Sequence, residues 1–176
     1  MKVIAGVAKG HKLKTTAGKH TRPTSGKVKE AMFSIIQSFL HNSMALDLFA
    51  GSGALGIEAL SRGASYCDFV EQSKKAVEII AFNLEKTRLN NYNIHNTAVK
   101  NFLSACTSKY DLVFIDPPYN KNLPSQVLQL MSERALLADN AIIVCETGAD
   151  EKIDTSLKIY KQSVYGDTKL TFYENR

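Results

Sequence analysis

Two short apolar runs, residues 112–115 (LVFI) and 141–145 (AIIVC), constrain the fold of this chain most. Neither run alternates with polar residues, so we expect each to be a strand covered by protein on both faces. The spacing of apolar residues between them predicts a helix over residues 124–133. A buried strand, a helix and another buried strand in succession are typical of a parallel sheet with right-handed crossovers.

The same alternation extends over most of the chain. Five further strands are predicted, at residues 45–49, 66–70, 94–99, 157–160 and 170–173. Four further helices are predicted, at residues 27–40, 55–61, 74–87 and 101–106. The last two strands are joined by a short link at Gly166 and should pair antiparallel. The sequence therefore predicts an α/β, Rossmann-like fold with a mostly parallel seven-stranded sheet, helices on both faces and an antiparallel C-terminal edge.

Positive charge is concentrated at the N-terminus. Residues 1–29 hold eight of the 22 Lys and Arg residues and none of the 17 Asp and Glu residues. Gly6, Gly10 and Gly18 separate short β-prone pieces, which predicts a small N-terminal β-hairpin. We therefore divide the chain into a basic hairpin arm, residues 1–21, and one domain, residues 22–176. A surface that binds a polyanion explains the arm better than a solvated lysine-rich tail, although that alternative stays open.

The three cysteines, Cys67, Cys106 and Cys145, are widely spaced and form no Cys-x-x-Cys pair. A disulfide framework or a zinc site is therefore not expected, and we predict no metal. The N-terminus has no signal-peptide pattern, and no apolar run approaches the length of a membrane span. These features predict a cytoplasmic protein without a membrane partner, and we expect a monomer.

Residues 47–56 (DLFAGSGALG) place the spacing G-x-G-x-x-G between a predicted strand and a predicted helix. Glycines at such a turn let the backbone approach a nucleotide-type ligand, and an acid about 20 residues on can bind ribose hydroxyls. Glu71, at the end of the next strand, is that acid. The spacing does not separate a dinucleotide from S-adenosylmethionine. Asp47 favours S-adenosylmethionine, because a carboxylate attracts its cationic methionine group and repels phosphate.

The run 112–115 is followed by Asp116-Pro117-Pro118-Tyr119. Two prolines fix φ and remove two backbone donors, so the carbonyls of the turn are free to accept hydrogen bonds. Asp116 can accept another, and Tyr119 offers a ring on which a flat ligand can stack. A flat amine fits this set, and the carboxyl ends of strands are where ligands bind in open α/β sheets.

These motifs together resemble a known family. Residues 46–56, 58–64 (EALSRGA), 116–119 and the Arg22-Pro23-Thr24 that follows a basic arm are similar to the RsmD family of bacterial 16S rRNA guanine-N2 methyltransferases, which are class I S-adenosylmethionine-dependent enzymes. The resemblance covers nearly the whole chain. It implies methyl transfer to the exocyclic N2 amine of a guanine, with rRNA of the 30S subunit or of an assembly intermediate as partner.

The resemblance also implies roles for individual residues. S-adenosylmethionine would be bound by Asp47, Gly51, Gly53, Glu71 and the backbone near Ala98. Asp116 and the carbonyl of Pro117 would accept hydrogen bonds from the amine, and Tyr119 would stack on the base. The substrate RNA would contact the arm through Lys9, Lys12, Lys14, Arg22 and Thr24.

Three other functions are compatible with parts of the sequence. A DNA adenine-N6 methyltransferase would use the same proline turn, but this chain has no room for a target-reading region. A protein glutamine methyltransferase would use a related turn, and the basic arm disfavours it. A ribosome-assembly factor without catalytic activity would also bind cofactor and RNA.

Overall fold

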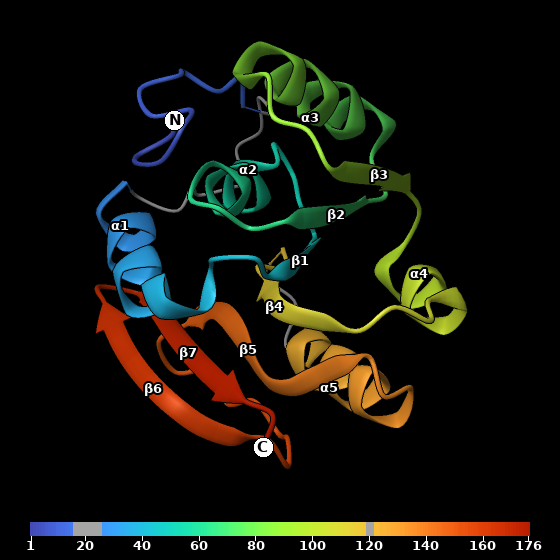
Figure 1. Cartoon of the computed structure of the whole chain (residues 1–176). Helices are drawn as coiled ribbons and strands as arrows, with labels where there is room; N and C mark the ends of the chain where they lie inside the picture. The colour runs from blue at the N-terminus through green and yellow to red at the C-terminus, as the bar shows by residue number, and fades with distance from the viewer. Residues whose placement is uncertain (16–25, 119–121) are drawn as a thin grey trace.

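The computed structural model describes residues 1–15, 26–118 and 122–176. Its centre is a seven-stranded sheet with the order β3-β2-β1-β4-β5-β7-β6 (Figure 1). The strands are β1 (Met44–Leu48), β2 (Tyr66–Glu71), β3 (Tyr92–Asn96), β4 (Tyr110–Ile115), β5 (Leu137–Gly148), β6 (Lys158–Tyr165) and β7 (Thr168–Glu174). The first five pair parallel, and β7 pairs antiparallel with both β5 and β6. The predicted fold class is confirmed.

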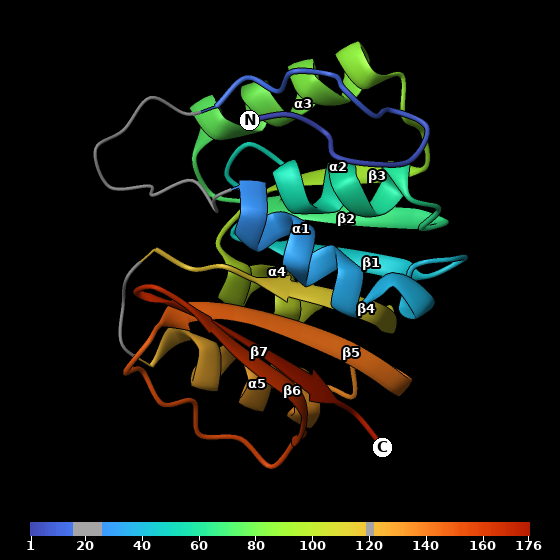
Figure 2. The ribbon, with the colours of Figure 1, turned by 90° about the vertical axis from the view of Figure 1, so that its left-hand side faces the viewer.

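Helices cover both faces of the sheet (Figure 2). They are α1 (Gly26–Ile35), a 3-10 turn η1 (Gln37–Phe39), α2 (Ala54–Ser61), α3 (Lys74–Thr87), α4 (Val99–Ala105) and α5 (Leu123–Glu133). One apolar core lies between the sheet and α1, α2 and α3, and a second lies between the sheet and α4 and α5. Burial on both faces explains the continuous apolar runs in β4 and in the centre of β5. None of the described helices is long and apolar enough to cross a membrane.

Several predicted elements have different bounds in the structure, and β5 extends beyond the predicted residues 141–145 at both ends. The helix expected over residues 27–40 stops at Ile35, and the chain continues as η1. The strand expected over residues 94–99 ends at Asn96, and Val99 already begins α4. β6 runs to Tyr165, well beyond the expected residue 160. β3 and β6 lie at edges of the sheet with mostly exposed side chains, so burial imposes no clear apolar pattern on their sequences.

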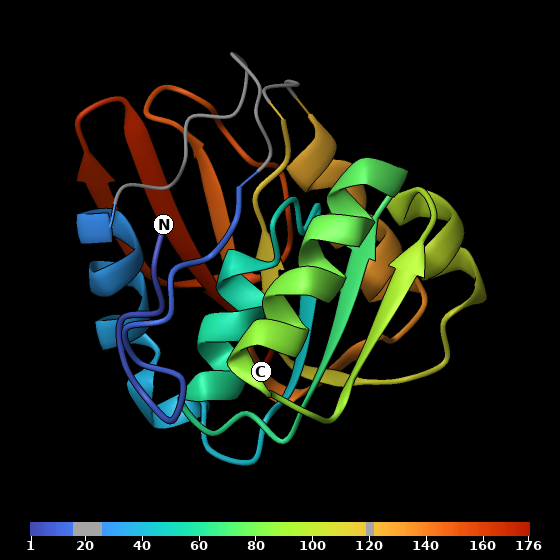
Figure 3. The same cartoon turned by 90° about the horizontal axis from the view of Figure 1, so that it is seen from above.

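The N-terminal segment, residues 1–15, packs against the domain. Its antiparallel reversal is closed by an isolated bridge between Lys2 and Lys12. Val3, Ala8 and Leu13 are buried in the core with α1 and α2, whereas its lysines are exposed. Figure 3 looks onto this face and shows the segment running over α2, between α1 and α3. The boundary predicted between residues 21 and 22 lies outside the described residues.

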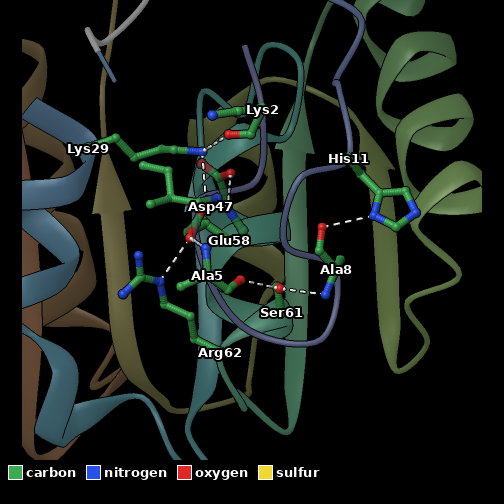
Figure 4. A network of polar contacts seen from close by, with 11 residues as sticks. Lys2, Ala5, Ala8, His11, Lys29, Asp47, Glu58, Ser61 and Arg62 are labelled. Carbon is green, nitrogen blue, oxygen red and sulfur yellow. Dashed lines mark hydrogen bonds and ion pairs between the residues drawn. The ribbon is translucent and has the colours of Figure 1, made fainter. Parts of the chain in front are cut away.

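A buried carboxylate fastens this segment to the domain (Figure 4). Glu58 of α2 accepts hydrogen bonds from the backbone N–H groups of Ile4 and Ala5, at 2.9 and 3.0 Å. It also pairs with Lys29 Nζ and Arg62 Nε, each at 2.8 Å. Burial opposes ionisation of Glu58, but these four donors outweigh it and hold its pKa below the usual value. The segment, α1 and α2 are thus joined through one fully buried charge.

Gly6 lies where the segment meets α2, and no side chain fits there. It has φ of +80°, and an added Cβ would lie 1.7 Å from the carbonyl oxygen of Ser61. Gly10 provides a matched control, because its φ is +87° but nothing lies within 4 Å of an added Cβ. Both alanine variants strain the backbone by about 1 kcal/mol, whereas only Gly6→Ala forces the segment away from α2.

We therefore expect Gly6→Ala to lower the free energy of unfolding by about 2 kcal/mol more than Gly10→Ala does. Urea denaturation, followed by circular dichroism, measures both variants against the unchanged protein. Equal losses for the two variants would show that the segment does not depend on its contact with α2.

Candidate functional site

The glycine turn between β1 and α2 has an unusual backbone. Phe49, Gly51 and Gly53 all have positive φ, at 60°, 56° and 77°. A non-glycine residue in this region is uncommon, and the conformation of Phe49 costs of order 1 kcal/mol. At Gly56, an added Cβ would lie 2.3 Å from the Phe69 ring, so this glycine lets α2 pack closely on β2. The turn is bent and tightly packed, which leaves its backbone N–H groups at the end of β1.

Two carboxyl groups hold this turn. Glu71, the last residue of β2, accepts hydrogen bonds from Gly51 N at 2.9 Å and from Ser73 N at 2.8 Å. Asp47, within β1, accepts one from Gly56 N at 2.8 Å. The predicted proximity of Glu71 to the glycine turn is therefore present in the structure. Asp47 is only 2 % exposed, so its carboxyl group lies buried beneath the turn.

Four acidic residues lie at the same edge and on the same face of the sheet, and we call this edge the acid edge. Glu71, Asp47, Asp116 and Glu146 lie at the carboxyl ends of β2, β1, β4 and β5, which are neighbours in the sheet. The residue two positions before each acid belongs to the core under α1, α2 and α3, and side chains alternate between faces. Glu146 did not emerge from sequence reasoning, because the strand predicted there stopped at residue 145.

This crowding changes the chemistry of two of the acids. Burial and, to a smaller extent, the charge of Glu71 raise the pKa of Asp47, the hydrogen bond from Gly56 N lowers it, and the net value is about 8. Loss of hydration also raises the pKa of Asp116 well above its usual value, with added repulsion from Glu146 and Asp47. Both carboxyl groups are therefore harder to ionise than ordinary carboxyl groups, and a nearby cation would favour their charged forms.

The proline turn lies directly beyond the end of β4. Asp116 and Pro117 are partly exposed and Pro118 is exposed. Tyr119 lies outside the described residues. Ala98, predicted to contact the cofactor, precedes α4 in extended conformation. Its neighbour Thr97 donates a backbone hydrogen bond to the carbonyl of Glu71 at 3.2 Å, so Ala98 lies near the acid edge.

The predicted substrate residues do not all lie together. Lys9 belongs to the turn that packs against Ser61, at the end of α2 far from the glycine turn. Lys12 and Lys14 instead lie against α3, where the carbonyl oxygen of Lys12 accepts a hydrogen bond from Lys86 Nζ at 2.7 Å. All three arm lysines are exposed. Arg22 and Thr24 lie outside the described residues.

Asn83 of α3 is a second residue that sequence reasoning missed. It is fully buried, and its side chain contacts both the N-terminal segment and the glycine turn. A signal was present in the sequence, because an amide on the apolar stripe of an amphipathic helix needs buried hydrogen-bond partners.

The chain matches known proteins over nearly its whole length. The model of the family described as "Conserved hypothetical protein 95" matches residues 1–174. The "Ribosomal RNA small subunit methyltransferase D" of Haemophilus influenzae is 34% identical over 99% of this chain and 94% of its own. The chain belongs to the RsmD family. The protein of the same name from Escherichia coli is 29% identical over 99% of this chain and 89% of its own.

Solved structures agree with this assignment. The Escherichia coli protein yhhF superposes with a TM-score of 0.90 at 28% identity and covers 100% of this chain and 98% of its own. The Thermus thermophilus protein TTHA0928 gives a TM-score of 0.84 at 26% identity over 98% of both chains. Both matches extend over nearly the whole chain, so the fold described here is common to these structures.

The raised pKa of Asp47 predicts a specific pH dependence of stability. The pKa of Asp47 is about 8 in the folded protein and 3.8 as its ordinary value, so the folded state holds this proton more tightly than the unfolded state does. Stability is therefore lost as pH rises between these values, with a slope of at most about 1.4 kcal/mol per pH unit from this group. We expect Asp47→Asn, which keeps an oxygen for Gly56 N, to raise the melting temperature more at pH 8 than at pH 5.

Differential scanning calorimetry at both pH values makes this comparison. Asp139→Asn is the matched control, because it makes the same chemical change at an exposed position. A stabilisation by Asp47→Asn that is equal at pH 5 and pH 8 would contradict the raised pKa.

Proposed function

We propose that this protein transfers the methyl group of S-adenosylmethionine to the exocyclic N2 amine of a guanine in 16S rRNA. Membership of the family supports rRNA methylation as the activity, because curated members bear the name "Ribosomal RNA small subunit methyltransferase D". The observation that carries the site is the acid edge, with Glu71 on the glycine turn and Asp116 at the end of β4. The substrate particle is the 30S subunit or an assembly intermediate, and the protein acts as a monomer.

The residues at the glycine turn fit S-adenosylmethionine. Glu71 already orients one carboxylate oxygen toward Gly51 N and the other toward Ser73 N, which leaves lone pairs for ribose hydroxyls. The nearest atom to a Cβ added at Gly51 is the carbonyl oxygen of Phe49, 3.9 Å away, so a ligand can approach the backbone here. Gly53 lets the chain turn into α2, and the backbone near Ala98 would contact the adenine.

Asp47 supplies the electrostatic part of cofactor binding. Its carboxyl group is buried and has a pKa of about 8, so it is largely protonated at neutral pH before a cation arrives. The ammonium group of a methionine moiety would favour the carboxylate form, and the proton would be released to solvent. Phosphate groups offer no such compensation, so the acid edge disfavours a dinucleotide.

When bound, S-adenosylmethionine supplies a methyl group that is already activated by its positive sulfur. The residues of the proline turn orient the nucleophile. Asp116 and the carbonyl oxygen of Pro117 each accept a hydrogen bond from one N–H group of the guanine amine. These two hydrogen bonds favour the pyramidal form of the nitrogen. Held by Asp47, Glu71 and the glycine turn, the cofactor would supply its methyl group to this nitrogen and would leave as the neutral thioether. The amine proton leaves to Asp116 or to water.

Two further groups would hold the RNA. Tyr119 stacks on the base after it has been turned out of its helix, as chemistry on a paired base requires. Lys9, Lys12 and Lys14, together with Arg22 and Thr24, bind phosphates and give affinity without reading sequence. Lys12 and Lys14 serve phosphates near the target, and Lys9 serves one farther along the strand. The fixed shape of a ribosomal particle then supplies specificity.

The product is the direct test of this function. Small subunits from cells that lack the enzyme, naked 16S rRNA and DNA are each incubated with labelled S-adenosylmethionine, and their nucleosides are analysed by mass spectrometry. We expect N2-methylguanosine from rRNA, with more product from the particle than from naked RNA. N6-methyladenine as the sole product would replace this function with adenine methylation.

The two acids at the site should fail in different ways. Asp116→Ala removes an acceptor for the amine, so we expect kcat to fall about 100-fold or more with cofactor affinity within about twofold of normal. Glu71→Gln weakens charge-assisted hydrogen bonds to ribose, which lowers cofactor affinity by about 1.5 to 3 kcal/mol, or roughly 10- to 100-fold.

Calorimetric titration with S-adenosylhomocysteine and single-turnover kinetics separate these two effects. Normal turnover by Asp116→Ala would show that Asp116 has a structural role only. An unchanged dissociation constant for Glu71→Gln would place the ribose elsewhere.

A further inference from the structure

Asn83 uses its whole side-chain amide to join two segments that are far apart in sequence. Its Oδ1 accepts a hydrogen bond from Lys14 N at 2.8 Å, and its Nδ2 donates to Lys14 O at 2.9 Å. The same Nδ2 donates to Ser52 O, also at 2.9 Å. The amide has one orientation that satisfies these partners, because two of them are acceptors and one is a donor. Asn83 is fully buried, so none of these bonds is exchanged for water without cost.

Each partner belongs to a different part of the proposed site. Lys14 is the last basic residue of the described N-terminal segment, and its ammonium group lies over the ring of Phe82, 5.5 Å from the ring centre. Ser52 lies between Gly51 and Gly53, the two glycines of positive φ in the turn. Glycine-rich backbone adopts several conformations at little cost, so a fixed carbonyl at Ser52 limits which one the turn adopts.

We propose that Asn83 is a positioning residue that couples the basic arm to the cofactor turn. RNA bound by Lys12 and Lys14 fixes the backbone of Lys14, which fixes the Asn83 amide and the carbonyl of Ser52. The turn is then held in the form that binds S-adenosylmethionine. Because coupling between two binding sites is reciprocal, bound cofactor tightens RNA binding by the same factor. This coupling rests on the proposed function, since it assumes that the arm holds RNA and the turn holds the cofactor.

The contacts around Asn83 explain why a shift at one end reaches the other. Leu13 is buried in the core and precedes Lys14, whose backbone is hydrogen-bonded to Asn83. Lys86 Nζ of α3 donates a hydrogen bond to the carbonyl oxygen of Lys12. The arm therefore lies against α3 over residues 12–14 and moves with it. Without Asn83, the peptide groups of Lys14 would lose their link to the turn while the apolar contact of Leu13 remained.

The first experiment needs no RNA and uses the unaltered protein. Hydrogen exchange of the Lys14 amide is measured by NMR with and without saturating S-adenosylhomocysteine. Because this amide donates to Asn83, we expect bound ligand to slow its exchange at least about fivefold. An unchanged exchange rate with the ligand bound would overturn the coupling, whether or not any variant folds.

The second experiment compares Asn83→Ala with Thr87→Val. Thr87 is also buried on α3, but its hydroxyl donates only to carbonyls of the same helix, so it is a matched loss of buried hydrogen bonding. The dissociation constant for S-adenosylhomocysteine is measured alone and with saturating unmodified 30S subunits. We expect the unaltered protein and Thr87→Val to bind the ligand at least about fivefold more tightly with the particle present. We expect Asn83→Ala to show a factor close to one.

The outcomes separate the coupling from the function on which it rests. Equal factors for Asn83→Ala and the unaltered protein would overturn the role of Asn83. If the unaltered protein binds the ligand but no ribosomal particle, the proposed function fails, and the exchange of Lys14 still decides whether Asn83 joins the arm to the turn.

Discussion

The crowding of four carboxyl groups, with that of Asp47 buried, at one edge of the sheet is the constraint on which the site depends. The order β2-β1-β4-β5 brings Glu71, Asp47, Asp116 and Glu146 side by side, because the carboxyl ends of parallel strands share an edge. Burial and mutual repulsion raise the pKa values of Asp47 and Asp116. Such a cluster lowers stability at neutral pH, and backbone donors such as Gly56 N offset only part of that cost. A cationic ligand is the natural complement to it.

The N-terminal segment is the second feature that shapes the site. Val3, Ala8 and Leu13 of the segment are buried, its lysines are exposed, and Glu58 joins it to α1 and α2. A basic surface is therefore built into the domain instead of being attached to it as a loose tail. The same segment is joined to the glycine turn through Asn83, so the proposed RNA-binding and cofactor-binding residues belong to one connected structure.

The sequence predicted the local parts of this arrangement well. Apolar runs located β4 and the centre of β5, and glycine spacing placed the turn between β1 and α2. The link between Glu71 and Gly51 followed from their separation along the chain. These features depend on short-range patterns, which a single sequence displays directly.

Contacts between distant segments were not predictable in the same way. Lys29 was counted only as one of the basic residues in 1–29, and its burial against Glu58 was not predicted. Glu146 was missed because pairing with β7 extends β5 to Gly148, beyond the apolar run that signalled the strand. Asn83 needed its partners Lys14 and Ser52 to be recognised. In each case the information lies in which elements meet, and no local pattern specifies that.

The central claim is that a cationic methyl donor supplies the positive charge that the carboxyl groups at this edge of the sheet lack. Calorimetric titration with S-adenosylmethionine at pH 7, in buffers of different ionisation enthalpy, counts the protons exchanged on binding and tests this claim most directly. The account predicts release of about one proton per bound ligand, lost from Asp47 as its pKa falls, and no release from Asp47→Asn. Binding without proton release, or tight binding of NAD in place of S-adenosylmethionine, would contradict it.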